Sequence, residues 1–231
     1  MLKTIKTFNP IKRAGEIESI VMKDGKRKYY RFRHSGHYGG IITADTVGCN
    51  LMCAYCWNYF KNLHPEKYGR FYSPEEVAKN MTKIARKRNV RLLRISGAEP
   101  ILGKASIYHL VKVIENVDYY FILETNGVIL GCMPELINML KGLNIKVRIT
   151  IKGWDEKSFE KFTRVDGGYF QYQLSALGEL LKRKITAWPA FMYDIFGEEG
   201  EKKLIEKLND IGVRRKDIEY EELIRYPWFN F

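Results

Sequence analysis

The chain has 231 residues, 45% of them hydrophobic, and can bury one sizeable core, which excludes a small scaffold held together by disulfides. It contains no run of about eighteen apolar residues and no signal-peptide pattern, so we expect a cytoplasmic protein without a membrane partner, in which closely spaced cysteines indicate a metal or catalytic site. The formal net charge of +12 permits an anionic partner, although Lys and Glu are spread along the chain as on solvated helix faces.

The N-terminal segment is expected to form a β-hairpin. Two β-favouring runs within residues 16–33 meet at Asp24-Gly25, a dipeptide typical of tight hairpin turns. The stretch KDGKRKYYRFRH (residues 23–34) interleaves aromatic residues with Lys and Arg and is a candidate contact for an anionic partner. A second basic stretch, residues 86–94, reads as a helix end that runs into a strand. We therefore expect a hairpin extension that covers or extends the mouth of a substrate site.

From residue 41 onward, predicted strands alternate with predicted helices. A short apolar strand, Ile41 to Ala44, leads into a cysteine-rich loop. The next helix starts at Ser73, with Pro74 at its first position and Glu76 completing a capping box. Further strands are expected at residues 90–96, 118–125, 145–151, 185–192 and 216–223, with helices at 104–116, 133–142, 155–162, 168–184 and 198–212.

Six strands with helices between them predict a parallel sheet with right-handed crossovers. We expect one domain at residues 41–231, preceded by the hairpin extension at residues 1–40. The pattern fits either an open doubly wound sheet or an incomplete (β/α) barrel, and both place their chemistry at the carboxyl ends of the strands. The segments expected there are TVGCNLMCAYC, SGAEP, ETNG and TIKGW after the first four strands and WPAFM at the end of the fifth.

Three of the four cysteines, Cys49, Cys53 and Cys56, lie within eight positions. Three thiolates can hold a 4Fe-4S cluster by three of its irons and leave the fourth iron open to a small molecule. Zinc is the main alternative, but structural zinc sites normally have four protein ligands. Cys132 and His64 could complete such a site, although neither has partner spacing; the first is expected to be a buried helix-start residue and the second a surface loop residue.

The segment CNLMCAYC resembles the Cys-x3-Cys-x2-Cys signature of the radical S-adenosylmethionine (radical SAM) enzymes, with Tyr55 in the aromatic position before the last cysteine. SGAEP resembles the family's Gly-Gly-Glu-Pro segment. ETNG and TIKG are similar to the Asp-Thr-Asn-Gly and Asp-Ile-Lys segments of the glycyl-radical activases, such as pyruvate formate-lyase activating enzyme. The resemblance covers roughly residues 41–195 and implies a partial (β/α)6 TIM-like barrel.

The resemblance also implies a mechanism. Cys49, Cys53 and Cys56 would bind one 4Fe-4S cluster, and the amine and carboxylate of SAM would chelate its open iron. An electron from a donor such as ferredoxin or flavodoxin would then cleave SAM to a 5'-deoxyadenosyl radical, which abstracts hydrogen from a substrate. Candidate SAM contacts are Tyr55, Gly97, Ala98, Glu99, Glu124, Thr125, Asn126, Thr150, Lys152, Phe191 and Met192.

The chemistry of several of these side chains agrees with such contacts. The small residues Gly97 and Ala98 let the backbone approach the methionyl amine, Glu99 adds negative charge beside it, and Lys152 supplies a cation for the carboxylate. Ala98, Glu124 and Thr150 depart from the activase pattern, which weakens the resemblance to that subfamily but not to the superfamily.

The substrate is not specified by the sequence. Three ligands and one further cysteine cannot build a second cluster, which makes enzymes with auxiliary clusters poor matches. An RNA base, a small molecule and a glycine of a partner protein are the substrate classes left, and the basic hairpin favours RNA. The alternatives without radical chemistry are an iron-sulfur electron-transfer protein and a zinc protein that binds nucleic acid.

Overall fold

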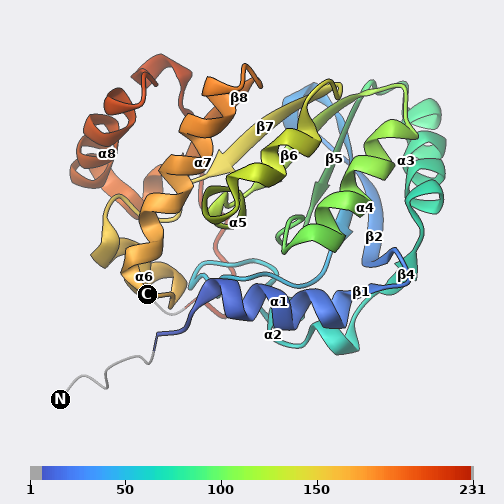
Figure 1. Ribbon diagram of the computed structural model, residues 1–231, viewed down its shortest axis with the longest axis horizontal. Helices are drawn as coiled ribbons and strands as arrows, with labels where there is room; N and C mark the ends of the chain where they lie inside the picture. Colours follow the sequence, from blue (N-terminus) through green and yellow to red (C-terminus); the bar gives the residue numbers. More distant parts are fainter. Residues whose placement is uncertain (1–6, 230–231) are drawn as a thin grey trace.

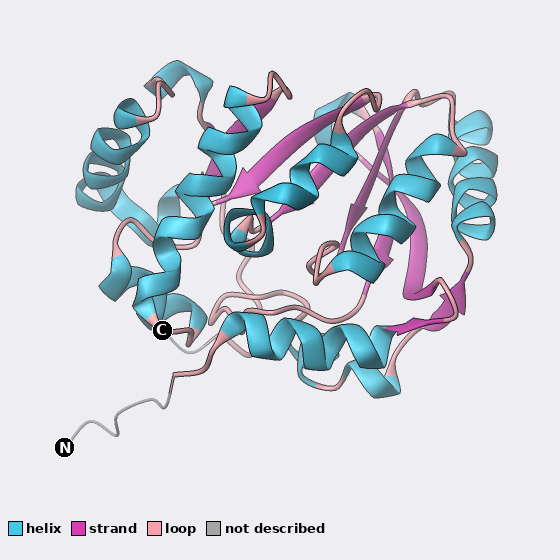
Figure 2. Cartoon of the chain, viewed as in Figure 1, coloured by secondary structure: helices cyan, strands magenta, loops and turns pink. Residues whose placement is uncertain are grey.

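The computed structural model describes residues 7–229 and shows one curved, mostly parallel sheet with helices packed against it (Figures 1 and 2). Six strands pair in parallel and in sequence order, as predicted: β3 (Ile41–Thr46), β5 (Leu92–Ser96), β6 (Tyr120–Thr125), β7 (Ile145–Thr150), β8 (Ala187–Met192) and β9 (Glu219–Glu221). In a doubly wound sheet the strand order reverses at a switch point. The unbroken order therefore identifies an incomplete (β/α) barrel whose sheet ends at β9 without closing.

Helices connect these strands and bury apolar stripes against the sheet. They are α3 (Pro74–Arg88), α4 (Lys104–Glu115), α5 (Val128–Cys132), α6 (Glu156–Thr163), α7 (Phe170–Lys182) and α8 (Tyr193–Asp210). The predicted capping box is present, because Ser73 Oγ accepts from Glu76 N while the Glu76 carboxylate accepts from Ser73 N. Figure 1 shows α4 and α7 lying across the same side of the sheet. Within residues 7–229, no helix combines the length and the apolar composition needed to cross a bilayer.

The N-terminal segment differs from its prediction. Residues 16–21, expected as the first strand of the hairpin, belong to helix α1 (Pro10–Val21), so that expectation is wrong. Asn9 caps this helix through Oδ1, which accepts from the backbone N–H groups of residues 11 and 12. Ala14, Ile17 and Val21 are buried at helical spacing. The β-branched residues of this run suggested a strand, but their helical period decided the structure.

The hairpin turn at Asp24-Gly25 is confirmed. Both residues have positive φ, 50° and 73°, as a type I' turn requires, and they join β1 (Met22–Lys23) to β2 (Lys26–Ser35). Strand β2 pairs antiparallel with β3 and with the short β4 (Arg70–Tyr72), so the hairpin extends the sheet. The proposed boundary at residue 40 stays a prediction.

The α-helix expected at residues 133–142 is instead a 3-10 helix. Helix α5 ends at Cys132, and a 3-10 helix, η3 (Pro134–Leu140), follows it. Met133 has φ −130° and ψ 67°, outside the helical region, which the ring of a following proline disfavours for the residue before it. Proline therefore opens the second helix and closes the first.

Candidate active site

A pocket of about 480 Å³ opens where the parallel strands end. Its wall includes all but one of the predicted site residues: Cys49, Cys53, Tyr55, Cys56, Gly97, Ala98, Glu99, Glu124, Thr125, Asn126, Thr150, Lys152 and Met192. Phe191 is fully buried instead and stacks on Phe196, with ring centroids 4.9 Å apart. Because neighbouring strand residues point to opposite faces, Met192 faces the pocket and Phe191 the core.

The cysteine loop is held in place by backbone contacts with elements on both sides. Met52 N and Ala54 N donate to the carbonyl oxygens of Thr163 and Phe162 at the end of α6, at 3.1 and 2.8 Å. From the other side, Arg13 of α1 donates to the carbonyl oxygen of Cys49 at 3.2 Å. The loop is therefore fixed by two helices that lie far apart in the sequence.

Cys53 is buried, and Cys49 and Cys56 are half-buried. Burial raises the pKa of Cys53 to about 12, and burial together with the negative charge of Glu99 raises the pKa of Cys49 further. Leu51 N donates to Cys49 Sγ at 3.4 Å, and Asn62 Nδ2 donates to Cys56 Sγ at 3.5 Å. Thiolates at these positions need cationic charge beside them.

The possible metal ligands do not form a preformed site for a single metal ion. Among residues 7–229, no three His, Cys, Asp or Glu side chains are grouped as a metal ion requires. Cys132 ends α5, and His64 pairs with Glu66 after the short helix α2 (Tyr59–Leu63); the described pocket wall includes neither of them. The choice of Cys49, Cys53 and Cys56 as cluster ligands therefore rests on their spacing and their common pocket.

Glu99 connects the loops that follow β5 and β6. It is 3% exposed, and its carboxylate accepts from Thr125 Oγ1 at 2.6 Å, Asn126 N at 2.8 Å and Ile101 N at 3.0 Å. Burial raises its pKa to about 7, against the opposing effect of these three donors. Glu99 thus fixes the shape of the pocket wall as well as its charge.

Gln173 of α7 holds the next pair of loops. This fully buried side chain donates to the carbonyl oxygens of Asn126 at 2.6 Å and Thr150 at 3.1 Å, and its own oxygen accepts from Lys152 N at 3.0 Å. Asn126 Nδ2 in turn donates to Asn50 Oδ1 in the cysteine loop at 2.8 Å. The loops after β3, β6 and β7 are therefore joined by amide side chains.

Gly97 is required by the fold itself. Its φ of 87° is unfavourable for other residues, and a Cβ at this position would lie 2.9 Å from the carbonyl oxygen of Thr46 at the end of β3. Its own carbonyl oxygen accepts from Asn58 Nδ2 at 2.6 Å. The glycine therefore permits close contact between the loops after β3 and β5.

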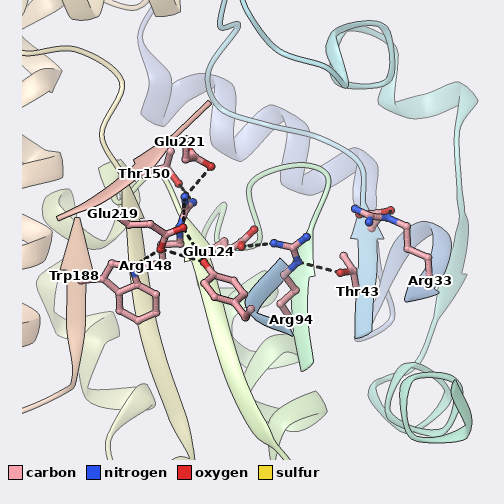
Figure 3. Close-up of polar contacts among 11 residues, drawn as sticks. Arg33, Thr43, Arg94, Glu124, Arg148, Thr150, Trp188, Glu219 and Glu221 are labelled. Carbon is pink, nitrogen blue, oxygen red and sulfur yellow. Dashed lines mark hydrogen bonds and ion pairs between the residues drawn. The ribbon is translucent and has the colours of Figure 1, made fainter. Parts of the chain in front are cut away.

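Charged side chains line the interior of the curved sheet below these loops (Figure 3). Arg94 of β5 donates to Thr43 Oγ1 at 2.9 Å and pairs with Glu124 of β6 at 2.6 Å. Arg31 and Arg33 of β2 share the fully buried Asp45 of β3. Barrel interiors are usually filled with branched apolar residues, so this interior is exceptional.

The same interior continues to the last strand. Arg148 of β7, with a side chain 4% exposed, pairs with Glu221 at 2.7 Å and Glu219 at 3.1 Å. Although burial opposes it, the hydrogen bond and charge of Arg148 keep the pKa of Glu219 below its usual value. Glu219 also accepts from Trp188 Nε1 at 2.6 Å and from the Tyr38 hydroxyl at 3.1 Å. Tyr38 lies in the turn before β3, so it connects the first and last parallel strands.

Comparison with known proteins agrees with this architecture. Residues 44–211 match the family model of the radical SAM superfamily. The chain belongs to this superfamily. It is 31% identical over 116 residues to a putative glycyl-radical enzyme activating enzyme, MJ1632, of Methanocaldococcus jannaschii, an alignment that covers 50% of this chain and 40% of that protein. It is also 31% identical over 123 residues to a probable GTP 3',8-cyclase of the same organism, covering 52% of this chain and 38% of that protein.

Solved radical SAM structures share the fold. SuiB of Streptococcus suis bound to S-adenosylmethionine superposes with a TM-score of 0.59 at 14% identity, over 81% of this chain and 39% of SuiB. A radical SAM methyltransferase from Sphaerobacter thermophilus gives a TM-score of 0.64 at 11% identity, over 90% of this chain and 66% of that one. The chain spans about two fifths of the length of the curated relatives named above.

The predicted superfamily, fold class and kind of cofactor are confirmed. Radical SAM proteins are enzymes that bind a 4Fe-4S cluster and SAM. The sequence did not lead us to predict a role in the site for Gln173 or for the arginines of the interior. A signal existed for each, because Gln173 interrupts the buried stripe of α7 and Arg94 and Arg148 each interrupt an apolar strand. A polar residue on an otherwise apolar face of a helix or strand indicates a position with a specific role.

Proposed function

We propose that this radical SAM chain holds a 4Fe-4S cluster by Cys49, Cys53 and Cys56 and uses it to cleave SAM reductively. The cluster would supply one electron for cleavage of the C5'–S bond of SAM, which would release methionine and leave a 5'-deoxyadenosyl radical able to take a hydrogen atom from a substrate. The proposal rests on one observation, that the predicted groups meet in one place. Three thiols and the loops that follow β5, β6 and β7 form the wall of one pocket.

The residues of this wall fit both groups. The thiols supply three ligands of the kind that iron-sulfur clusters take. The half-buried backbone at Gly97 and Ala98, with Glu99 next to it, suits an ammonium group, and Lys152 suits a carboxylate. Thr125, Asn126 and Met192 would face the nucleoside, while Glu124 and Thr150 are engaged by Arg94 and Arg148.

The proposed substrate is a small polar molecule with charged groups. Of an RNA base, a small molecule and a glycine in a partner protein, the interior favours the second, because guanidinium and carboxylate groups line it at alternate strand positions. Buried ion pairs add little stability compared with apolar packing, so their presence along a cavity supports a role in binding. The physiological electron donor is proposed to be a ferredoxin or flavodoxin.

The test is anaerobic reconstitution with iron and sulfide, followed by reduction with dithionite. The electron paramagnetic resonance spectrum is recorded with and without SAM, and 5'-deoxyadenosine is assayed. We expect a cluster signal that SAM perturbs, together with cleavage of SAM. A tightly bound zinc ion without iron, or a cluster whose spectrum does not change when SAM is added, would refute the proposal.

A further inference from the structure

A row of alternating aromatic rings and cations crosses the surface beside the last cysteine of the loop. Arg31 Cζ lies 5.8 Å from the ring centroid of Trp57 and 5.5 Å from that of Tyr30. Lys61 Nζ lies 5.0 Å from the Tyr30 centroid and 5.5 Å from the Tyr68 centroid. We call these five residues the cation–aromatic row. It joins the basic β2 strand to the cysteine loop and helix α2.

The row lies close to the sulfur of Cys56. Helix α2 carries Lys61 on the row, and the next residue, Asn62, is buried and donates to Cys56 Sγ at 3.5 Å. Phe60 and Leu63 of the same helix are 50% and 42% exposed. One helix of five residues therefore separates the protein surface from a proposed cluster ligand.

The C-terminal segment adds to this surface. Trp228 Nε1 donates to the carbonyl oxygen of Cys56 at 3.2 Å, and its ring packs edge-on against Phe60 with centroids 5.7 Å apart. Trp228 and Trp57 are each 36% exposed. Adjacent exposed apolar side chains of this kind mark interaction sites. We call the row together with Phe60, Leu63 and Trp228 the cysteine-side face.

We propose that the cysteine-side face is the docking surface for an acidic one-electron carrier protein. This inference rests on the proposed function, since only a cluster that needs an electron needs such a partner. The charge is complementary, because residues 57–72 contain three cations and one carboxylate in a chain of net charge +12. The carrier loses one electron, the cluster gains it, and no other reactant is needed.

Two observations favour a protein partner over single-stranded RNA. RNA binding of this type uses exposed ring faces on which bases stack. The ring of Tyr30 already carries two cations, and Trp57 carries Arg31. In addition, the face lies against Cys56, where an electron can enter, and of the residues of the face only Arg31 also belongs to the charged interior.

The test measures reduction of the reconstituted cluster under anaerobic conditions, by bleaching of its visible absorption. An acidic flavodoxin in its hydroquinone form is one reductant, and dithionite is the other. We expect Lys61→Glu to lower the second-order rate constant with flavodoxin about fivefold at low ionic strength. Phe60→Asp should lower it by a similar factor. Neither variant should change the rate with dithionite or the SAM cleavage that dithionite drives.

Lys202→Glu is the matched control. It makes the same charge change at an exposed position of α8, which packs beside β8 and β9 at the other edge of the sheet. Equal slowing by Lys202→Glu, unchanged flavodoxin rates in Lys61→Glu and Phe60→Asp, or failure of flavodoxin to reduce the unmodified protein would overturn the docking proposal. So would loss of oligouridylate binding in Lys61→Glu with normal flavodoxin kinetics. If dithionite produces no SAM cleavage in the unmodified protein, the proposed function fails instead.

Discussion

The two ends of the pocket are built in different ways. At the cysteine end, the functional groups come from four short loops, each continuous in sequence, and backbone groups and amide side chains hold them together. In the charged interior, the groups stand on the strands themselves, and each ion pair joins residues of different strands, as with Arg148 and Glu221. The first end is specified by motifs and the second by sheet register.

This difference has a consequence for specificity. The loops at the cysteine end present groups that suit the cofactors shared by the whole superfamily. The interior residues occupy alternate positions on strands, so each can change without disturbing the loops above it. Differences in substrate between relatives are therefore expected in the interior. The following variants test this separation.

The largest effect is expected at the cysteine loop. Cys53→Ala should remove cluster binding altogether, because two thiolates leave two irons without protein ligands. Cys132→Ala, outside the described pocket wall, should bind the cluster like the unmodified protein. Iron and sulfide contents after reconstitution provide the measurement. A cluster-free Cys132→Ala protein would move that residue into the site.

In the interior, Arg148→Met should destabilise the fold and leave SAM cleavage intact. Loss of the guanidinium leaves Glu219 and Glu221 side by side without a counter-charge, and we expect the free energy of unfolding to fall by about 3 kcal/mol. This value is at the low end of the range for breaking a buried ion pair, because both carboxylates remain partly exposed to water. Urea unfolding measures it, with Lys203→Met, which removes an exposed pair with Glu199, as the control. Equal losses of unfolding free energy in both variants would show that the interior network contributes no more stability than an exposed ion pair.

Glu99 should make stability at the cysteine end depend on pH. Its folded-state pKa of about 7 is above the ordinary carboxyl value, so the folded state holds the proton more tightly than the unfolded state. The free energy of unfolding should therefore fall as pH rises between about 4.5 and 7, by about 3 kcal/mol in total. Urea titrations at pH 5 and pH 8 on the unmodified protein and on Glu99→Gln measure this slope. A slope that persists in the variant would assign it to another group.

The smallest effect is expected for Tyr38→Phe. The variant removes only the hydroxyl that donates to Glu219, and the residue is 42% exposed, so we expect a loss of about 0.5–1 kcal/mol. Thermal unfolding with and without SAM provides the measurement. A change in SAM affinity would contradict the separation of the two ends.

The sequence predicted the cysteine end well because its chemistry is local. The spacing of Cys49, Cys53 and Cys56 can be read in eight residues, and alternating apolar runs predicted the six parallel strands. It could not show that Arg94 meets Glu124 or that Arg148 meets Glu221, because those contacts depend on strand register and sheet curvature. Helix α1 was missed because its β-branched residues resemble a strand, and Phe191 was grouped with Met192 because alternation along β8 was not applied.

The contact between Tyr38 and Glu219 determines how the open sheet is fastened. A closed barrel is joined along its whole length by backbone hydrogen bonds between neighbouring strands. Here the turn before β3 meets β9 through one side-chain hydroxyl. The segment after β9 adds the hydrogen bond from Trp228 Nε1 to the carbonyl oxygen of Cys56, so side chains and not a ladder join this side. The strength of this closure therefore depends on a few side chains, whereas the loops of the pocket wall are held by their own hydrogen bonds.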